Sequence, residues 1–561
     1  MDKTDEVALM FLGVDVGGTF TDAVVVDNKR ILKQVKVKTN SENVLQGILT
    51  ALDRILENCE LDLLERVVVS STVVTNALIV GDTEEVFLAV MPGTGMDITN
   101  SFPVAPFIVE GYVNHHGKVT KNVELNYLAA QAQAKGKRVA AISGKFSVRN
   151  QSNEVALRQE LSELDFEQFF LGSEMSGELN FVRRTNSAYF SAAIYQKYAH
   201  FIHQIVTSIR SRGINVPIHI LKADGGTMPI EVALQHPVEA IFTGPAASVL
   251  GIEALSLPEG QAISLDVGGT TTDIAFWENG RPLLANKGAR INGFPTTVRA
   301  YHMRSVPIGG DSLLQRQGDA YLVGPKRVDV AAALGGNKAT LGDALIVLSV
   351  VSFGDIEKAK NALIKLCYDG EDHLVVAMRF VEVAVSVLEQ TIKEMIQEWE
   401  VKPVYTVNDM ISGTSFRPEI LVGVGGGATG LVQRLALKMN LPVSVPPGAM
   451  VANAVGAALA RPTLIGTLRA DSQEGYYIIP EGGIREDLSC QATRSELEDI
   501  LRSWLLSEAQ RWHLPVAGVE VIACEEFTTI QNYYSIGKIV YLKMQLAPGI
   551  IYGVQGQEVS F

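Results

Sequence analysis

The chain has 561 residues, 47% of them hydrophobic and 20% charged, with a formal net charge of −14. This length and apolar content predict more than one domain with sizeable cores, and the acidic balance argues against a nucleic-acid binder, which needs clustered Lys and Arg. No apolar run reaches the roughly 18 residues of a transmembrane helix, no signal-peptide core opens the chain, and its four cysteines have neither disulfide nor metal spacing, so we expect a cytoplasmic protein.

A β-hairpin is predicted at residues 8–28, because two apolar runs flank the turn Asp15-Val16-Gly17-Gly18-Thr19-Phe20-Thr21-Asp22. Residues 266–273 repeat seven of these eight positions between two further apolar runs. One such turn is a weak signal, since glycine-rich hairpins are common. Two near-identical copies predict a duplicated architecture with a function in the turn. The alternative is two ordinary hairpins in a duplicated scaffold.

The repeated turn has the composition of a phosphate-binding loop. Its glycines allow a sharp turn and bring backbone N–H groups close to a ligand; they are Gly17, Gly18, Gly268 and Gly269. Hydroxyl donors at the turn are Thr19, Thr21, Thr270 and Thr272. Asp15 and Asp266 end the incoming strands and are candidates to hold Mg²⁺ through water. Asp22 and Asp273 are candidates to orient the turn or polarise a nucleophile, so these four carboxylates are the candidate catalytic residues.

A second polar cluster follows the next predicted strand. A helix is expected at 43–59 and a short buried strand at 67–69, after which come Ser71, Thr72, Thr75 and Asn76. Hydroxyls and an Asn just after a strand lie where α/β folds place ligands, so we expect these residues on the substrate side. The alternative is that Ser71 or Thr72 caps the following helix, and the two roles are compatible.

The rest of the first half alternates strands and helices. Strands are expected at 86–90, 139–142 and 217–221, and helices near 126–135, at 154–163 and from 183 to 212. Asp224 and Gly225 follow the last of these strands and are further substrate-side candidates. A helix rich in small residues is expected at 246–255, just before the second hairpin at 262–279.

A glycine-rich turn is the main feature after the second hairpin. Residues 280–345 are loop-rich and form either a substrate-side loop or a surface insertion; the candidates there are Gly309, Gly310 and Asp311. An amphipathic helix is expected at 374–399. A strand from residue 420 then runs into a turn and a helix, an arrangement that can cradle a nucleotide. The glycines of this turn are Gly425, Gly426 and Gly427.

The C-terminal part of the chain has a different character. A strand at 443–445 and a helix rich in Ala and Gly at 449–460 complete the second half, and small residues permit the close helix approach that a hinge requires. Residues 466–561 have more aromatics and Glu and lack phosphate-type turns. We therefore predict a small α/β appendage there, with a helix at about 495–511 and strands near 519–524 and 538–546.

The order of these elements resembles that of the actin-like ATPase superfamily. It is a phosphate-binding hairpin, a small-residue helix, a second such hairpin, a glycine turn and a second small-residue helix. Six blocks narrow the resemblance to the hydantoinase A/5-oxoprolinase family: residues 14–22, 71–78, 184–186, 223–226, 243–247 and 266–273. The resemblance implies an α/β fold with two actin-like ATPase (ribonuclease H-like) domains, at 8–180 and 181–465. Residues 446–465 are expected to return to the first domain, and 466–561 to form the small appendage.

The same resemblance implies an ATP-dependent enzyme that phosphorylates a cyclic amide, imide or ketone carbonyl before hydrolysis or carboxylation, often with a separate B-type subunit. It assigns metal and phosphate contacts to Asp15 and Asp266, phosphate contacts to the hairpin Gly and Thr residues, and adenosine contacts to residues 425–427. Phosphoryl transfer needs mainly positioning and charge neutralisation. ATP, Mg²⁺ and a small-molecule substrate are the expected ligands, nucleic acid and membrane are not expected partners, and a homo-oligomer is left open.

The substrate side departs from the family pattern more than the ATP side. Where the family usually has Gly-Gly-Gly-Ser, this chain has Gly309-Gly310-Asp311-Ser312, and the family's proline-rich block is replaced around 328–336. The family's Gly-Pro-His is Ala428-Thr429-Gly430 here. The family's His before Gly-Thr-Thr is absent, and Ser70-Ser71-Thr72 occupies that place. The substrate is therefore left open. Two alternatives on the same fold also stay open, namely a small-molecule kinase and a nucleotide-driven chaperone or reactivating ATPase.

Overall fold

A computed structural model describes residues 9–554 except 28, 40–43, 286–287, 327–329, 402–414 and 532–533. Parts of several predictions lie outside the described residues: the ends of the hairpin 8–28, the helix start at Asn43, residues 286–287 and 327–329 of the loop-rich segment and replaced block, and residues 532–533 and 555–561 of the appendage.

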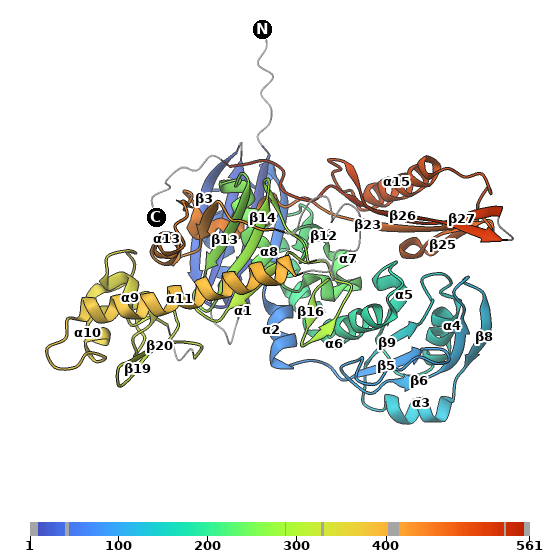
Figure 1. Cartoon of the computed structure of the whole chain (residues 1–561), viewed down its shortest axis with the longest axis horizontal. Helices are drawn as coiled ribbons and strands as arrows, with labels where there is room; N and C mark the ends of the chain where they lie inside the picture. The colour runs from blue at the N-terminus through green and yellow to red at the C-terminus, as the bar shows by residue number, and fades with distance from the viewer. Residues whose placement is uncertain are drawn as a thin grey trace, which may run out of the picture.

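The first half is built on a six-stranded sheet in the order β12-β11-β4-β1-β2-β3 (Figure 1). β1, β2 and β3 are antiparallel neighbours, whereas β1, β4 and β11 run parallel. Every residue of β1 is buried, as expected for a central strand covered on both faces. The bounds are β1 (Met10–Val16), β2 (Phe20–Asp27), β3 (Arg30–Lys38), β4 (Leu64–Ser71), β11 (Ile218–Leu221) and β12 (Thr227–Pro229).

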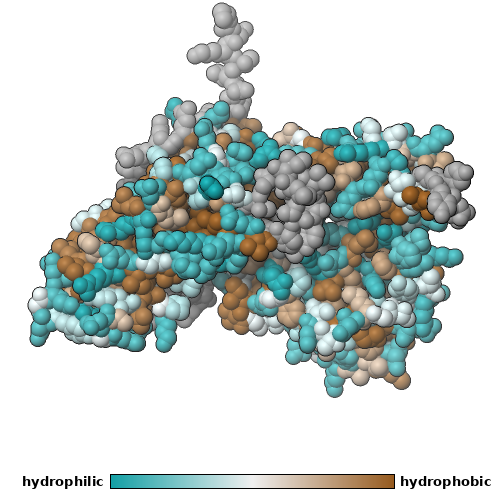
Figure 2. All heavy atoms as spheres, viewed as in Figure 1, coloured by the Kyte–Doolittle hydropathy of each residue, from teal (hydrophilic) through white to brown (hydrophobic). Residues whose placement is uncertain are grey.

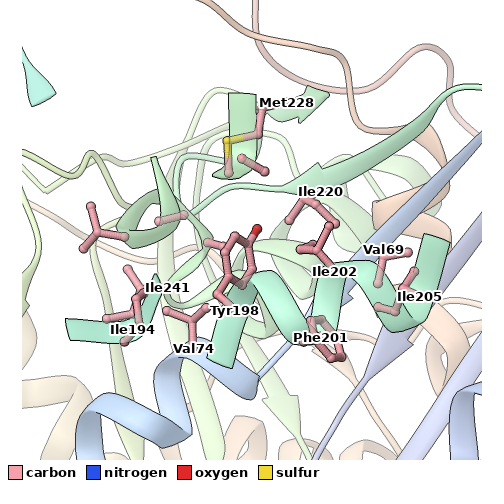
Figure 3. Packing of buried hydrophobic residues seen from close by; sticks show 14 of the residues in the cluster. Val69, Val74, Ile194, Tyr198, Phe201, Ile202, Ile205, Ile220, Met228 and Ile241 are labelled. Carbon is pink, nitrogen blue, oxygen red and sulfur yellow. The ribbon is translucent and has the colours of Figure 1, made fainter. Parts of the chain in front are cut away.

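Helices pack with this sheet in one hydrophobic core. They are α1 (Val44–Leu56), α2 (Val73–Val80), α6 (Phe181–Arg210) and α7 (Ile230–Gln235). The long helix α6 turns Tyr198, Phe201 and Ile202 toward Val69 of β4 and Ile220 of β11 (Figure 3). This core supports the edge of the sheet from which the candidate site residues emerge.

The second half repeats the arrangement. β14 and β18 follow β13 as antiparallel neighbours, while β13, β21 and β22 run parallel. The order β18-β14-β13-β21-β22 therefore matches β3-β2-β1-β4-β11, which is the ribonuclease H-like strand order. The predicted two-domain actin-like ATPase fold is confirmed. The bounds are β13 (Gln261–Val267), β14 (Thr272–Glu278), β15 (Arg281–Pro282), β18 (Met303–Val306), β21 (Ile420–Val424), α13 (Ala428–Met439) and β22 (Val443–Ser444).

Each half carries an insertion, drawn at opposite sides of Figure 1. The first contains β5 (Val86–Met91), β6 (Phe107–Ile108), β7 (Glu110–Val113), β8 (Val119–Glu124), α3 (Tyr127–Ala134), β9 (Val139–Gly144), α4 (Ser152–Leu161), β10 (Gln168–Leu171) and α5 (Gly172–Met175). The second contains β19 (Leu314–Gln317), β20 (Ala320–Val323), α9 (Leu341–Val347), α10 (Ile356–Ile364) and α11 (His373–Glu400). Hydrophobic residues are interspersed with hydrophilic ones on the surface of the second insertion (Figure 2).

Two helices of small residues cross where the halves meet. They are α8 (Thr243–Leu255) and α14 (Ala452–Leu459), and α14 also lies against β1. A Cβ on Gly251 of α8 would lie 2.1 Å from the carbonyl oxygen of Ala452. A Cβ on Gly13 of β1 would lie 2.1 Å from the carbonyl oxygen of Ala454. Only glycine permits these approaches, so α14 is held in backbone contact with both neighbours.

The C-terminal appendage is a five-stranded sheet in the order β25-β24-β23-β27-β26, packed against one helix. Its bounds are β23 (Ile465–Asp471), β24 (Tyr476–Ile479), β25 (Ile484–Asp487), α15 (Arg494–Arg511), β26 (Val519–Gln531) and β27 (Tyr534–Leu546). The predicted boundary at 180 differs from the sheet topology, because β11 and β12 still belong to the first sheet. None of the described helices is long and apolar enough to cross a bilayer.

Candidate functional site

Four aspartates stand in two pairs at the carboxyl ends of the central strands β1 and β13. Asp15 lies opposite Asp22 in the β1–β2 register, and Asp266 lies opposite Asp273 in the β13–β14 register. The carboxyl ends of parallel strands are where α/β folds bind ligands. The two pairs are neighbours in space, since the charges of Asp22 and Asp266 both raise the pKa of Asp15. The fold therefore gathers the four predicted catalytic carboxylates.

The turns of the two hairpins are in contact. Thr19 Oγ1 of the first turn donates a hydrogen bond to Asp311 Oδ2, at 3.2 Å. A Cβ on Gly269 of the second turn would lie 2.6 Å from Thr19 Oγ1 and 2.7 Å from Asp311 Oδ2. The backbone N–H groups of Gly310 and Asp311 donate to the carbonyls of Gly268 and Gly269, at 2.9 and 2.6 Å. Residues 309–311 thus lie over the turn of the second hairpin, and Asp311 reaches the turn of the first.

The glycine turn after β21 lies beside Asp266. Gly425 has φ +88°, and a Cβ there would lie 2.5 Å from Asp266 Oδ1, so only glycine fits. Its N–H donates to the Ala449 carbonyl at 2.9 Å, and the N–H of Gly427 donates to the Val267 carbonyl at 3.2 Å. Gly426 is exposed, with no atom within 4 Å of a Cβ built on it. This turn offers open backbone next to a buried carboxylate.

The Asp15 carboxyl is the most constrained group of the cluster. Burial raises its pKa to about 7, hydrogen bonds with Ser70 and Asn453 lower it, and the charges of Asp22 and Asp266 raise it. Its Oδ1 atom is buried and has no hydrogen-bond partner in the described part of the chain. A buried carboxylate oxygen without a partner is costly, and a bound cation would supply the missing interaction.

The two hairpins differ in charge at equivalent positions. Lys36 of β3 faces Asp22 in the register, and its Nζ lies 2.7 Å from both carboxylate oxygens. The equivalent residue of β18 is Ser305, which faces Asp273. Burial raises the pKa of Asp22, against the effect of Lys36. Burial, and then the charge of Asp266, raise the pKa of Asp273 to about 7, and a hydrogen bond with Ser305 lowers it. The charge of Asp22 is thus balanced by the Lys36 ammonium, whereas the partner of Asp273 at the equivalent position is the uncharged hydroxyl of Ser305.

Two of the predicted phosphate-binding threonines are used inside the hairpins. Thr21 and Thr272 are both 0% exposed. The Thr21 hydroxyl bonds that of Thr39 at 3.0 Å, and the Thr272 hydroxyl donates to the Ile308 carbonyl at 2.8 Å. Their hydroxyls therefore brace the strands. Of the turn residues predicted to bind phosphate, Gly18 is exposed, and Gly17, Gly268, Gly269 and Thr270 are partly exposed.

The polar cluster after β4 joins two helix N-termini. Ser71 Oγ accepts from the Val73 N–H at 3.2 Å, a local turn contact just before α2; the N-cap of α2 is Thr72, whose side chain makes no cap hydrogen bond, so neither Ser71 nor Thr72 is the side-chain cap. The Thr243 hydroxyl, at the start of α8, donates to the Ser71 carbonyl at 2.8 Å. Thr75 Oγ1 accepts from the Phe242 N–H at 2.9 Å. These contacts hold the start of α2 against the start of α8.

Two further predicted residues of this cluster, Thr72 and Asn76, also bond locally. Asn76 Nδ2 donates to Thr72 Oγ1 at 3.3 Å, and the Thr72 hydroxyl donates to the Val16 carbonyl at the end of β1, at 3.3 Å. Thr72 therefore ties α2 to the first phosphate hairpin. A substrate role for these residues stays a prediction.

Asp224 and Gly225 lie in a tight junction. Asp224 is buried, accepts from the Gly226 N–H at 3.0 Å and lies 3.5 Å from Lys222 Nζ. A Cβ on Gly225 would lie 2.0 Å from the hydroxyl of Tyr301, which comes from the second half. The local contacts explain both residue types without a ligand, so their substrate role also stays a prediction.

The sequence analysis did not predict two residues of the carboxylate cluster. Lys36 is one of several Lys in β3, and only the strand register selects it as the partner of Asp22. Asn453 is on α14, and its Nδ2 donates to Asp266 Oδ2 at 3.1 Å. An Asn among the Ala and Gly residues of that helix was the signal that could have identified it.

The cluster fits a hydrated divalent cation with a nucleotide. Within the described ranges, no three His, Cys, Asp or Glu side chains are grouped to chelate a metal by themselves. Mg²⁺ commonly uses one or two carboxylates, several waters and substrate phosphates, which matches carboxylates at strand ends beside glycine turns. An open hollow of about 760 Å³ lies elsewhere, between β20 and α11, and none of the four aspartates lines it.

Two sequence models of one family match the chain. The model described as hydantoinase/oxoprolinase matches residues 184–465, and the model described as hydantoinase/oxoprolinase N-terminal region matches residues 11–164. The uncharacterized protein MJ0964 of Methanocaldococcus jannaschii is 23% identical over 506 residues, covering 80% of this chain and 72% of that protein. Caprolactamase subunit alpha of Pseudomonas jessenii is 25% identical over 391 residues, covering 61% of this chain and 55% of that subunit.

Two solved structures share the fold over nearly the whole chain. One is the ATP-dependent caprolactamase from Pseudomonas jessenii, with a TM-score of 0.70, 18% identity, and coverage of 98% of this chain and 89% of that chain. The other is the nucleotide-free acetone carboxylase described for ATP-dependent acetone carboxylation, with a TM-score of 0.69, 17% identity, and coverage of 96% and 88%.

Proposed function

Because the chain belongs to the hydantoinase/oxoprolinase family, we propose that it is an ATP- and Mg²⁺-dependent enzyme that activates a carbonyl group by phosphorylation. The substrate class is a cyclic amide, an imide or a ketone, and hydrolysis or carboxylation follows activation. The observation that carries the proposal is the meeting of two carboxylate hairpins, one from each half, beside the Gly425 turn.

The choice of a carbonyl substrate is supported by the two enzymes that share the fold. One is named for a lactam and the other for acetone, and both are described as ATP-dependent. Amide and ketone carbonyl groups react slowly with weak nucleophiles. Transfer of the terminal phosphoryl group of ATP to the carbonyl oxygen forms an O–P bond and breaks the bond between that phosphorus and ADP. In an amide this turns the carbonyl oxygen into a leaving group, and in a ketone the same transfer with loss of an α-proton to a base gives an enol phosphate.

The residues would divide this work between the two hairpins. Asp15, Asp266 and Asp273 would accept hydrogen bonds from metal-bound water, and Asp22 is held by Lys36 as part of the first turn. The N–H groups of Gly17 and Gly268 donate to the carbonyls of Phe20 and Thr271 inside the hairpins, so the remaining N–H groups of the two turns would contact phosphate oxygens. Mg²⁺, when bound, would neutralise the charge that develops on the phosphates. The hydrogen bond from Thr19 to Asp311 links the first hairpin to the second half beside this site.

The test is ATP turnover by the purified protein with a panel of lactams, hydantoins, 5-oxoproline and ketones, the ketones with bicarbonate. We expect at least one class to stimulate turnover in the wild type. Asp266→Asn should abolish the stimulation, whereas Asp369→Asn, at an exposed site in the second insertion, should not. Failure of the wild type to bind nucleotide, or turnover that survives Asp266→Asn, would refute the proposal.

The product distinguishes the alternatives on the same fold. A stable phosphorylated small molecule would indicate a kinase. ATP turnover raised by a protein and by no metabolite would indicate a chaperone or reactivating ATPase.

A separate B-type subunit is also part of the proposal, because the relative from Pseudomonas jessenii is named as the alpha subunit of its enzyme. We expect nucleotide binding by this chain alone and full turnover only with that subunit. Full turnover by this chain alone would remove the subunit from the proposal.

A further inference from the structure

Asn453 occupies an unusual place in the carboxylate cluster. It is contributed by α14, while Asp15 belongs to the first sheet and Asp266 to the second. Its Nδ2 donates to Asp266 Oδ2 at 3.1 Å, and the same side chain interacts with the Asp15 carboxyl. One amide is therefore hydrogen-bonded to the aspartate of the second half and lies near enough to the equivalent aspartate of the first half to lower its pKa.

The backbone around Asn453 fixes where its side chain can reach. The preceding residue, Ala452, has its carbonyl against Gly251 of α8, and the following residue, Ala454, has its carbonyl against Gly13 of β1. Gly13 lies two residues before Asp15 on the same strand. The segment before the helix is bonded to the second half, because the Ala449 carbonyl accepts from the Gly425 N–H at 2.9 Å. Rotation or sliding of the helix would break at least one of these contacts.

The chemistry of an amide suits this place better than that of a cation. The two N–H bonds of Nδ2 point in different directions, so one can serve each carboxylate. An amide carries no charge, so it holds the two aspartates near each other and leaves both charges for a cation. At the Asp22 position the protein does the opposite, because the Lys36 ammonium neutralises that carboxylate at 2.7 Å.

We propose that Asn453 is a positioning residue that sets the separation of Asp15 and Asp266 across the two halves, so that both carboxylates contact one hydrated Mg²⁺ on the bound nucleotide. The assignment rests on the nucleotide and metal site of the proposed function. Asn453 acts through the two aspartates and takes no part in bond making. Its loss should weaken the contribution of Mg²⁺ to nucleotide binding and leave metal-free binding largely unchanged.

Two substitutions separate the lost donor from changes in packing. Asn453→Ala shortens the side chain, whereas Asn453→Leu keeps nearly the same shape, and both remove the N–H donors. An effect that the two variants share therefore comes from the donors. The matched controls are Asn361→Ala and Asn361→Leu, because Asn361 is an exposed helical residue of α10 in the second insertion.

The measurement is calorimetric titration of each full-length variant with ADP, once with Mg²⁺ and once with EDTA, after thermal melting has shown that the variant is folded. The dissociation constant for ADP in EDTA, divided by that in Mg²⁺, measures how much the metal strengthens binding. We expect this ratio to fall about tenfold in both Asn453 variants, which is about 1.4 kcal/mol. Dissociation constants for ADP in EDTA should stay within about twofold of wild type, and the Asn361 controls should match wild type in both conditions.

Three outcomes would overturn the assignment. One is an unchanged ratio in both Asn453 variants while the wild type shows metal-dependent binding. The second is an equal loss of affinity with and without Mg²⁺, which would indicate a purely structural role. The third is failure of the wild type to bind nucleotide at all, which would refute the proposed function and the role of Asn453 together.

Discussion

The Lys36–Asp22 ion pair allows a direct test of whether Lys36 stabilises the buried Asp22 carboxylate of the first hairpin. The perturbation is Lys36→Met, which keeps the length of the side chain and removes the ammonium. In the wild type, Nζ lies 2.7 Å from both Asp22 oxygens and 3.2 Å from the Met450 carbonyl. After the substitution, the Asp22 carboxylate keeps its burial and its acidic neighbours but has no cation.

The expected loss of stability follows from the burial of the pair. Removing one partner of a fully buried ion pair costs about 3–5 kcal/mol, whereas an exposed pair contributes about 0–1 kcal/mol. The Lys36 and Asp22 side chains are 21% and 11% exposed, so we expect a loss of about 2–3 kcal/mol at pH 8.

The loss should also depend on pH. Lys36 opposes the raised pKa of Asp22, so the substitution raises this pKa further in the folded state. A group with a raised folded-state pKa loses its contribution to stability as pH rises through that value. The loss caused by Lys36→Met should therefore be small near pH 4 and complete above the folded-state pKa.

Urea unfolding of the wild type, Lys36→Met, Asp22→Asn and the double variant at pH 5 and pH 8 checks this reasoning. The double variant carries no unpaired charge and should unfold within about 1 kcal/mol of wild type. A double variant as unstable as Lys36→Met, or a loss that is equal at both pH values, would refute the charge explanation. Retained Mg²⁺–ADP binding by the double variant would further identify Asp22 as structural.

Three other changes test separate features. Ser305→Lys would place an ammonium opposite Asp273, as Lys36 lies opposite Asp22, and we expect Mg²⁺-dependent ADP affinity to fall about tenfold in calorimetry; unchanged affinity would show that Asp273 does not bind the hydrated metal. Tyr198 Oη is buried without a partner in the described part of the chain (Figure 3), so Tyr198→Phe should raise stability by about 1 kcal/mol in thermal melting, and a clear loss would show that the hydroxyl is bonded in solution. Burial raises the pKa of Glu239 to about 7, with Lys222, Lys543 and Arg299 lowering it and Asp224 raising it. The protonated form of Glu239 therefore stabilises the fold below pH 4.5, and this contribution is lost as pH rises through about 7. Glu239→Gln should gain up to about 3 kcal/mol on wild type between pH 5 and pH 8 in unfolding titrations, and a constant difference would contradict the raised pKa.

Local patterns predicted most of the elements near the site. The hairpins at 8–28 and 262–279, the long helix from 183 to 212, the helix at 374–399 and the appendage helix at 495–511 each correspond to observed elements within a few residues. Apolar periodicity and glycine turns are local properties, so they can be read along the chain. The loop-rich prediction for 280–345 missed several short strands, among them β18, β19 and β20, because strands of two to four residues carry little periodic signal.

Consecutive residues are enough to show that two hairpins with the pattern DxGGTxTD end their first strands in carboxylates. The differences between these carboxylates arise from contacts between segments far apart in the chain. Lys36 reaches Asp22 through the pairing of β2 with β3, Ser305 takes the equivalent place beside Asp273 through β18, and Asn453 reaches Asp15 and Asp266 because Gly13 and Gly251 let α14 lie in backbone contact with its neighbours. The electrostatics of the site depend on burial and on partners distant in the chain, and folding alone brings those partners together.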